Sequence, residues 1–569
     1  MPLSLGKWPS IIIVCMPLAV TFGKYIYRKM TDKPVLDAIQ PIAELEAPDN
    51  NPEVSGQVAT GILEESISSL SAAEKFKNDG NRCFYNYRYV DAIRCYSKAI
   101  DICPKEHTTE LAIYYHNRAA CHEMIENWIQ VKEDCAKALE CNRRYAKAYF
   151  RRACAHVATM DLKECLADIT ATCILEDCKN EQNMKLRHSV GQQLAIANAK
   201  ERMLREGTSL PSKRYIRSYL ATFIADPMLK MTLPSSAVAD APVRGFARAH
   251  RAFLEERFED VISGCTEEID SSAAGGQYKM HALFLRATLH LLSGSAQECE
   301  RDLQALLGYD ETDDELRIYA QIRYATLIFQ ANQDGLFLGA LNHAEMLDPN
   351  NPDIYNQRAM LLSHMERFEE ALVDFEIAAR LAPSHALTVL NKYLANYRIA
   401  VKEGDQHRLD MSIQRLQQTT GRFPDCEEGL VMLSQVHTEQ KNFLQASKCL
   451  ERAIQLSPTN AELLCHQAVL ELEWHDDIEL FYAKLEQAIL LDPQCRLIYE
   501  NLGRAELRLK NLPLAVNYFL WAISHSRGLE EIYNACILHN ATVAEVTALE
   551  NLDMVEEDLA VDILHIPLP

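Results

Sequence analysis

The stretch PDIYNQRAMLLSHMERFEEALVDFEIAARLAP, from Pro352 to Pro383, has the pattern of a helical hairpin. Small and aromatic side chains fall at its eighth, twentieth, twenty-fourth and twenty-seventh positions, which are Ala359, Ala371, Phe375 and Ala378. Small residues at helix crossings allow two helices to pack closely, because the distance between helix axes depends on the side chains at the contact. A proline ends the second helix because it cannot continue the hydrogen-bond ladder. The stretch therefore predicts two antiparallel helices joined by a short turn.

The same landmarks recur along most of the chain. Clear units begin near residues 73, 112, 146, 318, 352, 427, 461 and 496, and weaker units are expected in 242–317 and 386–426. A repeat of about 34 residues with this pattern is typical of tetratricopeptide repeats. One hairpin cannot bury its apolar face alone, so neighbouring units stack into a curved solenoid. We predict an all-α tetratricopeptide-repeat superhelical solenoid whose concave surface, lined by the first helix of each unit, is the natural binding surface.

An apolar run near the N-terminus predicts a membrane anchor. Residues 8–23 read WPSIIIVCMPLAVTFG, and Lys24 and Arg28 follow them. A helix extended to Tyr27 spans about 30 Å, which matches the hydrocarbon core of a bilayer. A cleaved secretory signal and a buried helix are the alternatives, but no clean small-x-small cleavage site follows the run. We predict a single transmembrane signal anchor within residues 1–30.

The remaining segments are assigned from composition and repeat boundaries. Residues 31–70 carry eight acidic side chains and four prolines, which predicts an acidic flexible tether. A module of three repeats is expected at 71–180 and a helical connector at 181–241. The C-terminal repeat array is expected at 242–530, with a capping helix and tail at 531–569, because the ends of a solenoid need covering.

Five polar residues of the first three units form a candidate binding site. They all fall on the first helix of their hairpin: Lys77, Asn81, Asn117, Lys147 and Arg151. Side chains four positions apart share a helix face, and stacked hairpins align these faces along one groove. Ammonium, guanidinium and amide groups are donors that suit a carboxylate ligand. One such residue is usually just solvated, but with roughly 5% background frequency for each type the joint chance is on the order of 10⁻⁶.

These five residues resemble the dicarboxylate clamp of tetratricopeptide co-chaperones. That clamp holds the C-terminal Glu-Glu-Val-Asp of the cytosolic seventy- and ninety-kilodalton heat-shock chaperones. The resemblance implies that Lys77, Asn81 and Asn117 hold the terminal aspartate and its α-carboxylate. Lys147 and Arg151 would hold carboxylate or carbonyl groups further upstream. The second unit departs from the usual landmarks at Val131 and Cys135, although its clamp asparagine is intact.

The order of anchor, acidic tether, clamp repeats, connector and long second array resembles the family of seventy-kilodalton import receptors of the mitochondrial outer-membrane translocase. The resemblance implies a single-pass protein of that membrane with the bulk of the chain in the cytosol. It also implies docking of chaperones, receipt of hydrophobic precursor proteins such as carriers, and contact with other translocase subunits. The alternative is a membrane-anchored co-chaperone or scaffold at another organelle with no precursor-import role.

Several other classes are disfavoured by composition and motifs. The net charge of −22 argues against nucleic-acid binding, which depends on clustered Lys and Arg. No phosphate-binding glycine loop, nucleophile elbow or complete zinc motif is found, and His122-Glu123 lacks the second histidine of a zincin. None of the 18 cysteines forms a C-x-x-C pair, which favours free thiols in a reducing compartment. We expect no catalytic residue, metal or cofactor.

The anchor can be tested apart from the rest of the chain. Residues 1–35 fused to a fluorescent protein should label the mitochondrial outer membrane, because this short, moderately apolar span with basic flanks resembles the signal anchors of proteins of that membrane. Fluorescence microscopy with organelle markers measures this. Labelling of the endoplasmic reticulum would contradict the receptor interpretation.

Overall fold

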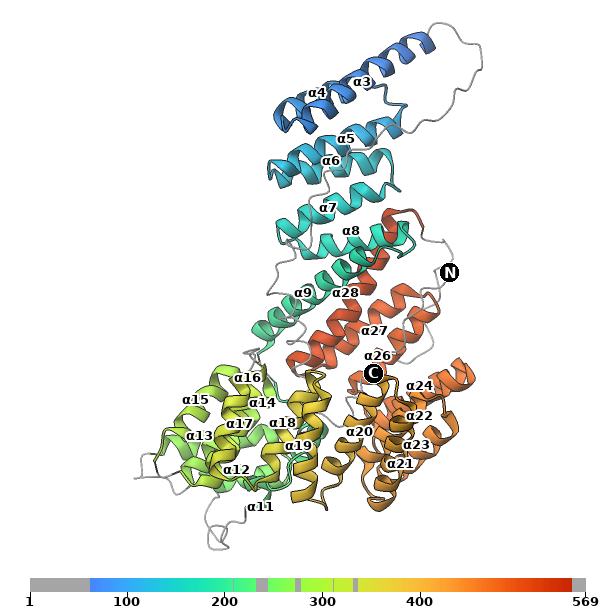
Figure 1. The fold of residues 1–569 in the computed structure, drawn as a ribbon. Coiled ribbons are helices and arrows are strands. Elements are labelled where there is room, and N and C mark those ends of the chain that lie inside the picture. The colour runs from blue at the N-terminus through green and yellow to red at the C-terminus, as the bar shows by residue number, and fades with distance from the viewer. Residues whose placement is uncertain are drawn as a thin grey trace.

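The computed structural model describes residues 62–207, 209–231, 244–271, 278–310, 312–330 and 336–554. Within these ranges the chain forms 26 α-helices and no strand, as Figure 1 shows, so the expected all-α solenoid is confirmed. The anchor expected within 1–30 and most of the tether lie outside the described residues. Among the helices that are described, none is both long and apolar enough to cross a bilayer.

The first three hairpins stack into a column at the top of Figure 1. They are α3 (Ile62–Tyr85) with α4 (Tyr89–Ile102), α5 (Thr108–Met124) with α6 (Trp128–Cys141), and α7 (Ala146–Ala158) with α8 (Leu162–Leu175). The first helix of each hairpin therefore carries the residues assigned to the candidate site.

Eight further hairpins form the broader, curved array in the lower part of Figure 1. The region of weak landmarks at 242–317 folds as two hairpins, α12 (Gly245–Leu254) with α13 (Phe258–Asp270) and α14 (Lys279–Ser293) with α15 (Ala296–Leu307). The next four are α16 (Asp314–Gln330) with α17 (Leu336–Leu347), α18 (Pro352–His364) with α19 (Phe368–Leu381), α20 (Ala386–Glu403) with α21 (Gln406–Arg422), and α22 (Glu427–Glu439) with α23 (Phe443–Leu456). The last two are α24 (Ala461–His475) with α25 (Ile478–Leu491) and α26 (Arg496–Arg508) with α27 (Leu512–His525).

The landmark residues lie where the helices of a hairpin cross. Ala359, Ala371 and Ala378 are completely buried. Gly80 takes the place of the first of these alanines in its own hairpin, and a Cβ there would lie 2.8 Å from the ring of Tyr96. This contact is shorter than real Cβ contacts, so the glycine allows the aromatic ring to pack directly against the backbone of α3.

An arginine–aspartate pair with a buried aspartate and a partly buried arginine is repeated in four hairpins. The arginine comes from the first helix and donates two hydrogen bonds to an aspartate on the second helix, 16 residues later: Arg118–Asp134, Arg152–Asp168, Arg286–Asp302 and Arg358–Asp374. Three of the arginines also reach the preceding hairpin, through Ser97, Thr266, and Asn342 with Glu345. Bidentate pairs of this kind fix geometry as well as adding energy, so they set the angle between successive helices.

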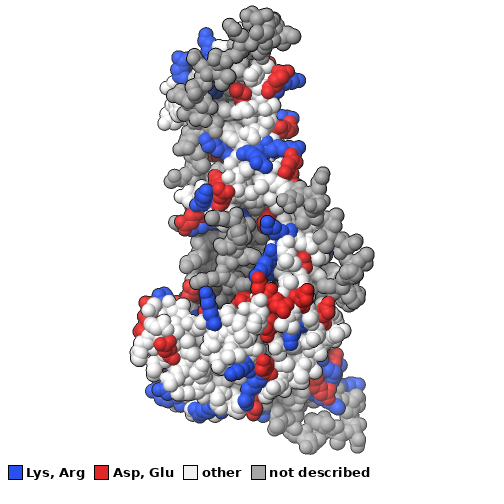
Figure 2. Space-filling model, turned by 90° about the vertical axis from the view of Figure 1, so that its right-hand side faces the viewer, with Lys and Arg blue, Asp and Glu red and all other residues white. Residues whose placement is uncertain are grey.

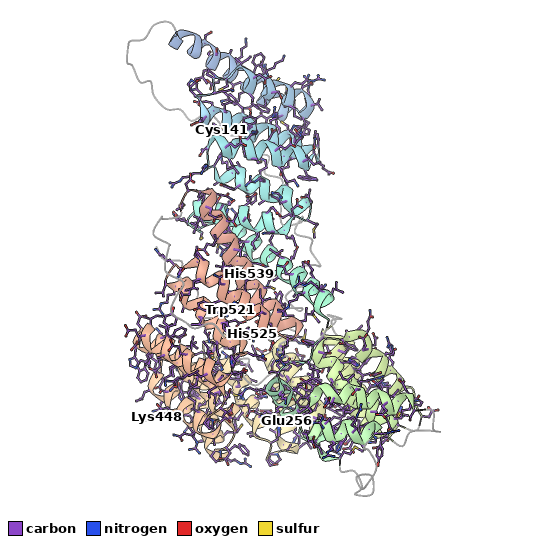
Figure 3. The ribbon with its side chains drawn as sticks, turned by 180° about the vertical axis from the view of Figure 1, so that it is seen from behind. Cys141, Glu256, Lys448, Trp521, His525 and His539 are labelled. Carbon is purple, nitrogen blue, oxygen red and sulfur yellow. The ribbon has the colours of Figure 1, made fainter. Side chains whose placement is uncertain are left out.

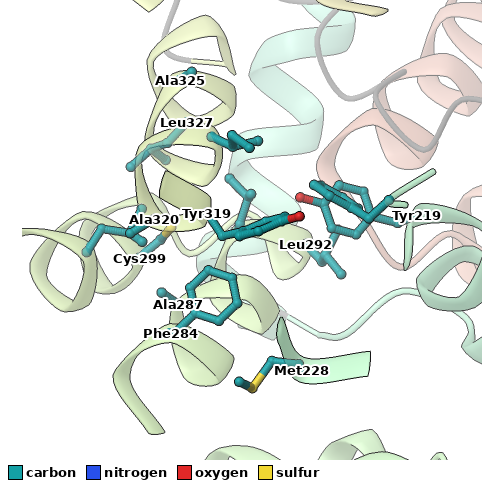
Figure 4. Packing of buried hydrophobic residues seen from close by; sticks show 14 of the residues in the cluster. Tyr219, Met228, Phe284, Ala287, Leu292, Cys299, Tyr319, Ala320, Ala325 and Leu327 are labelled. Carbon is teal, nitrogen blue, oxygen red and sulfur yellow. The ribbon is translucent and has the colours of Figure 1, made fainter. Parts of the chain in front are cut away.

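The segment expected to be a connector enters the array. Residues 209–230, called here the inner segment, include α10 (Lys213–Ala221) and α11 (Pro227–Lys230). The side chains of Tyr219, Phe223 and Met228 are buried in the same apolar cluster as the first helices of the array, as Figure 4 shows for Tyr219 and Met228.

Polar groups of the array also bind the backbone of the inner segment. Asp353 accepts hydrogen bonds from the backbone N–H groups of Ile224 and Ala225, at 2.7 and 2.8 Å. Asn356 donates to the carbonyl oxygen of Thr222 at 2.8 Å. The residues that hold the segment belong to first helices, so the segment lies along the concave surface of the array.

The Asp226 carboxylate, near the end of the inner segment, is buried. Asp226 pairs with Arg323 on α16, and both side chains are 1% exposed. The guanidinium also lies 3.9 Å from the centroid of the Phe223 ring. Buried ions are stable only when they are paired and hydrogen-bonded, so this pair ties the inner segment to the third hairpin of the array.

Two long helices join the column to the array. Helix α9 (Glu181–Glu206) follows the third hairpin, and α28 (Leu529–Asn551) follows the last. Helix α28 packs against α27, α9 and α8, and Asn198 on α9 donates to Asn540 on α28 at 3.1 Å. Figure 3 shows Trp521 and His525 on α27 and His539 on α28 in this junction. The C-terminal end of the solenoid therefore lies against the N-terminal module.

The buried ion pair predicts a large effect of a small change. Replacing Asp226 with Asn keeps a side chain that caps α11 but leaves the Arg323 guanidinium without its counter-ion. We expect the free energy of unfolding to fall by about 3–5 kcal/mol, measured by urea unfolding followed by circular dichroism.

The control for this change is Glu370→Gln, which breaks the exposed pair of Arg367 and Glu370. Its expected cost is below about 1 kcal/mol. Equal unfolding midpoints for the two variants would contradict the role given to Asp226.

Candidate peptide-binding site

Helix α3 supplies Lys77 and Asn81, and α4 orients the second of them. The hydroxyl of Tyr96 donates to Oδ1 of Asn81 at 2.6 Å, and burial raises the pKa of Tyr96, which keeps the hydroxyl protonated. With its oxygen engaged, the Asn81 amide presents its NH₂ group as the remaining donor. Nζ of Lys77 lies 3.4 Å from the Glu74 carboxylate on the same helix.

Helix α5 supplies Asn117, which is completely buried. Within the described residues neither Nδ2 nor Oδ1 of its amide makes a hydrogen bond of good geometry, and its polar neighbour is the His116 side chain. Burying an amide without well-formed hydrogen bonds costs about 1–3 kcal/mol, and most buried polar side chains avoid this cost. The described residues therefore leave most of the hydrogen-bonding capacity of the Asn117 amide unused.

Helix α7 supplies Lys147, which is exposed, and Arg151, whose side chain is 5% exposed. Nε of Arg151 donates to Oε2 of Glu123 at 2.8 Å. Nη1 contacts Nε2 of His116 and lies 3.3 Å from the His116 carbonyl oxygen. Two residues of α5 thus hold the guanidinium. Glu123 binds it from the end of the helix, and His116 binds it from the middle.

The environment of His116 is cationic. Burial lowers its pKa well below the ordinary value, and the nearby positive charges of Arg151 and Lys147 lower it further. A neutral ring can accept a hydrogen bond from the guanidinium through one nitrogen. Lys147 and Arg151 thus both lie close enough to His116 to disfavour its protonated form.

The five residues lie at the expected places, on the first helices of consecutive hairpins. Asn117, Lys147 and Arg151 gather around His116 at the junction of α5 and α7, whereas Lys77 and Asn81 lie one hairpin earlier on α3. Figure 2 shows Lys and Arg interspersed with Asp and Glu along the column on the face it displays.

Three residues around the site were missed by the sequence analysis. Tyr96 and His116 were not among the candidate site residues, and Glu123 entered only as part of an incomplete zinc motif. In the described part of the chain no cluster of His, Cys, Asp and Glu could hold a metal ion. Glu123 could have been recognised from its position at the end of α5, because Arg151 on α7 lies at the same level.

Comparison with known proteins places the chain in a family. A tetratricopeptide repeat model matches residues 352–385 and 427–460. The mitochondrial import receptor subunit TOM70 of rat is 35% identical over 484 residues, which cover 83% of this chain and 79% of the relative. The chain belongs to the TOM70 family. It is accordingly a receptor-type protein and not an enzyme.

Two further similarities are more limited. The crystal structure of yeast Tom70 covers 84% of this chain and 96% of that chain, at 20% sequence identity and a TM-score of 0.47. The Hsp70/Hsp90 co-chaperone cns1 of Schizosaccharomyces pombe is 42% identical over 97 residues, which cover 16% of this chain and 27% of that relative.

The neutral state of His116 predicts a pH dependence of stability. Its pKa is lowered in the folded protein, so below about pH 6.5 the unfolded chain binds a proton that the folded chain does not. Stability is therefore lost as the pH falls. Between pH 7 and 5.5 this one group should remove about 1 kcal/mol.

A His116→Gln variant, which keeps an acceptor for Arg151, should lose correspondingly less stability over this range. Urea unfolding at the two pH values, read as the difference between variant and wild type, measures the effect. His407→Gln changes a more exposed histidine on α21 and serves as the control. An equal loss of stability in wild type and His116→Gln would contradict this interpretation.

Proposed function

We propose that this protein is a receptor of the mitochondrial outer membrane that docks cytosolic heat-shock chaperones and receives hydrophobic precursor proteins for import. The proposal assigns chaperone docking to the first three hairpins, through the acidic C-terminus of the seventy- and ninety-kilodalton chaperones. The observation that supports this most directly is the buried amide of Asn117, which makes no well-formed hydrogen bond within the described residues and lies beside His116, the residue that Arg151 and Lys147 approach from α7.

The chemistry of the site favours a carboxylate-rich peptide end. Lys147 is exposed and offers an ammonium for first contact, while Arg151 offers a planar fork that matches a carboxylate. The NH₂ groups of Asn81 and Asn117 are donors for a terminal carboxylate or a peptide carbonyl. A hydrogen bond to a charged group contributes about 1.5–3 kcal/mol, so several of them offset the cost of ordering a short peptide and give about micromolar affinity.

Ligand binding would rearrange the site. Asn117 is completely buried, Nζ of Lys77 lies 3.4 Å from the Glu74 carboxylate, and Arg151 is held by Glu123. A bound peptide would have to replace these contacts. A change of side-chain rotamers with little backbone movement is common when preorganised proteins bind their ligands.

The C-terminal array is the proposed receiver of the precursor. The inner segment buries its apolar side chains against the concave surface between α14 and α18, and Arg214 continues along that surface to Glu427 on α22 and Glu462 on α24. We therefore assign the precursor to surfaces of the array that the inner segment does not cover. The anchor within residues 1–30 would hold the receptor in the outer membrane beside other translocase subunits.

The alternative function is that of a membrane-anchored co-chaperone or scaffold with no role in import. Similarity to the co-chaperone cns1 favours it, but that similarity spans only 16% of this chain. The relationship to TOM70 spans 83% and includes regions outside a three-repeat module. Import receptor is therefore the better supported of the two functions. Import assays with carrier precursors, with and without this protein, distinguish the two directly.

Chaperone docking is tested with a peptide that ends in Glu-Glu-Val-Asp. Arg151→Ala should weaken its binding at least about tenfold, because a charge-assisted pair is lost. Lys147→Ala should weaken it about three- to tenfold, since its side chain is exposed and the loss is of long-range attraction. Isothermal titration calorimetry measures both affinities.

The matched control is Lys137→Ala, which removes an exposed lysine of α6 that pairs with Glu140. Circular dichroism checks that each variant stays folded, which matters for Arg151 because its loss leaves Glu123 without its partner. Unchanged affinity in folded Lys147→Ala and Arg151→Ala would refute the assignment of the site.

A further inference from the structure

The contact between Glu123 and Arg151 stands out among the ion pairs of the N-terminal module. It joins two neighbouring hairpins, and its two side chains are 12% and 5% exposed. Most other pairs of the module lie within one helix or within one hairpin. The carboxylate of Glu123 comes from the last turn of α5, at the level where α7 brings the guanidinium.

Glu123 takes up hydrogen-bonding capacity that an acidic ligand needs. A guanidinium has five N–H donors in a fixed fork. In Arg151, Nε is committed to Glu123 and Nη1 to His116. A ligand carboxylate that binds this fork side-on must therefore displace the Glu123 carboxylate.

The partial exposure of Glu123 makes such a displacement feasible. A completely buried carboxylate that lost its partner would carry a large desolvation cost. Glu123 lies at the end of α5 and keeps part of its side chain in contact with solvent. On leaving Arg151 its carboxylate can be hydrated, so the exchange trades one carboxylate for another at the same cation.

We infer that Glu123 is a resident carboxylate that occupies Arg151 in the unliganded protein and competes with the acidic end of the incoming peptide. The inference rests on the function proposed above and adds an element that sets its affinity. Glu123 holds the guanidinium in place between encounters and balances its charge. It also lowers affinity, which favours release of the chaperone once its cargo has been delivered.

The test uses the detergent-solubilised full chain and a synthetic peptide ending in Glu-Glu-Val-Asp. Glu123→Gln keeps the shape of the side chain and removes its charge. A neutral acceptor holds a guanidinium about half as strongly as a carboxylate, so the peptide should bind about fivefold tighter than to wild type. Calorimetry at two salt concentrations measures the affinity. Glu123→Asp keeps the negative charge on a shorter side chain, so its peptide affinity should increase less than that of Glu123→Gln.

Glu140→Gln is the matched control, because it removes one carboxylate from the same module at an exposed pair with Lys137. If Glu140→Gln increased the peptide affinity as much as Glu123→Gln, the increase would be an effect of net charge, and the inference would be overturned. Equal or weaker binding by folded Glu123→Gln would overturn it as well. If Glu123→Gln does not fold, the Glu123→Asp variant decides the question by the same criterion.

The failure of this inference can be told apart from the failure of the proposed function. If wild type binds the peptide and Arg151→Ala does not, the site is real, and only the Glu123 variants decide the role of Glu123. If wild type binds the free-acid peptide and its C-terminal amide equally weakly, the proposed function fails and the inference fails with it.

Discussion

The structure depends on one constraint, which is that a helical hairpin buries only part of its apolar surface and exposes the rest to its neighbour. Within the column and within the array each hairpin packs against the next, the third hairpin packs against α9 and α28, and the last hairpin is covered by α28. Helix α28 then continues beyond α27 to α9 and α8, where Ala544, Ala548 and Leu552 enter the apolar clusters of the third hairpin. A solenoid end that would otherwise face water becomes the joint between the two modules.

The same constraint explains why the two concave surfaces differ. In the C-terminal array the side chains of the inner segment cover the concave surface. Asp353 there binds the backbone of Ile224 and Ala225, and Arg323 pairs with Asp226. In the N-terminal module no described segment lies across the first helices in this way. Lys77 and Arg151 there contact Glu74 and Glu123, and the Asn117 amide makes no well-formed hydrogen bond within the described residues. One surface is therefore part of the core, and the other is the one to which we assign peptide binding.

Local pattern was sufficient to predict the hairpins and the helices on which the five candidate residues lie. Small residues such as Ala359 and Ala371 mark helix crossings at fixed spacing, and that spacing also sets which residues of the first helices face the groove. The path of the inner segment was not predictable in this way. Its contacts join residues far apart in the sequence, such as Asp353 with Ile224, separated by 129 positions, and no periodicity marks them.

The arrangement around Arg151 was only partly predictable for a related reason. The repeat spacing predicted the helix face on which Arg151 lies, because the face of a side chain depends only on its position within its own helix. Its partners depend on how α5 and α7 pack, and the signal for Glu123 is a single charge among many on the chain. The pairs of Arg118 with Asp134 and of Arg152 with Asp168 are a contrasting case, since their constant spacing of 16 residues is visible in the sequence once the hairpin is known.

The two buried arginines show how one type of ion pair serves two purposes. Arg323 and Asp226 are both 1% exposed, and aromatic rings surround the guanidinium, so separating them would leave two charges in an apolar interior. Arg151 is similarly enclosed, but its partner Glu123 is 12% exposed and can turn to solvent. Because the cost of breaking a pair is set mainly by the desolvation of the ions left behind, the first pair is a permanent part of the core. The second is held firmly enough to fix the guanidinium and loosely enough for another carboxylate to take its place.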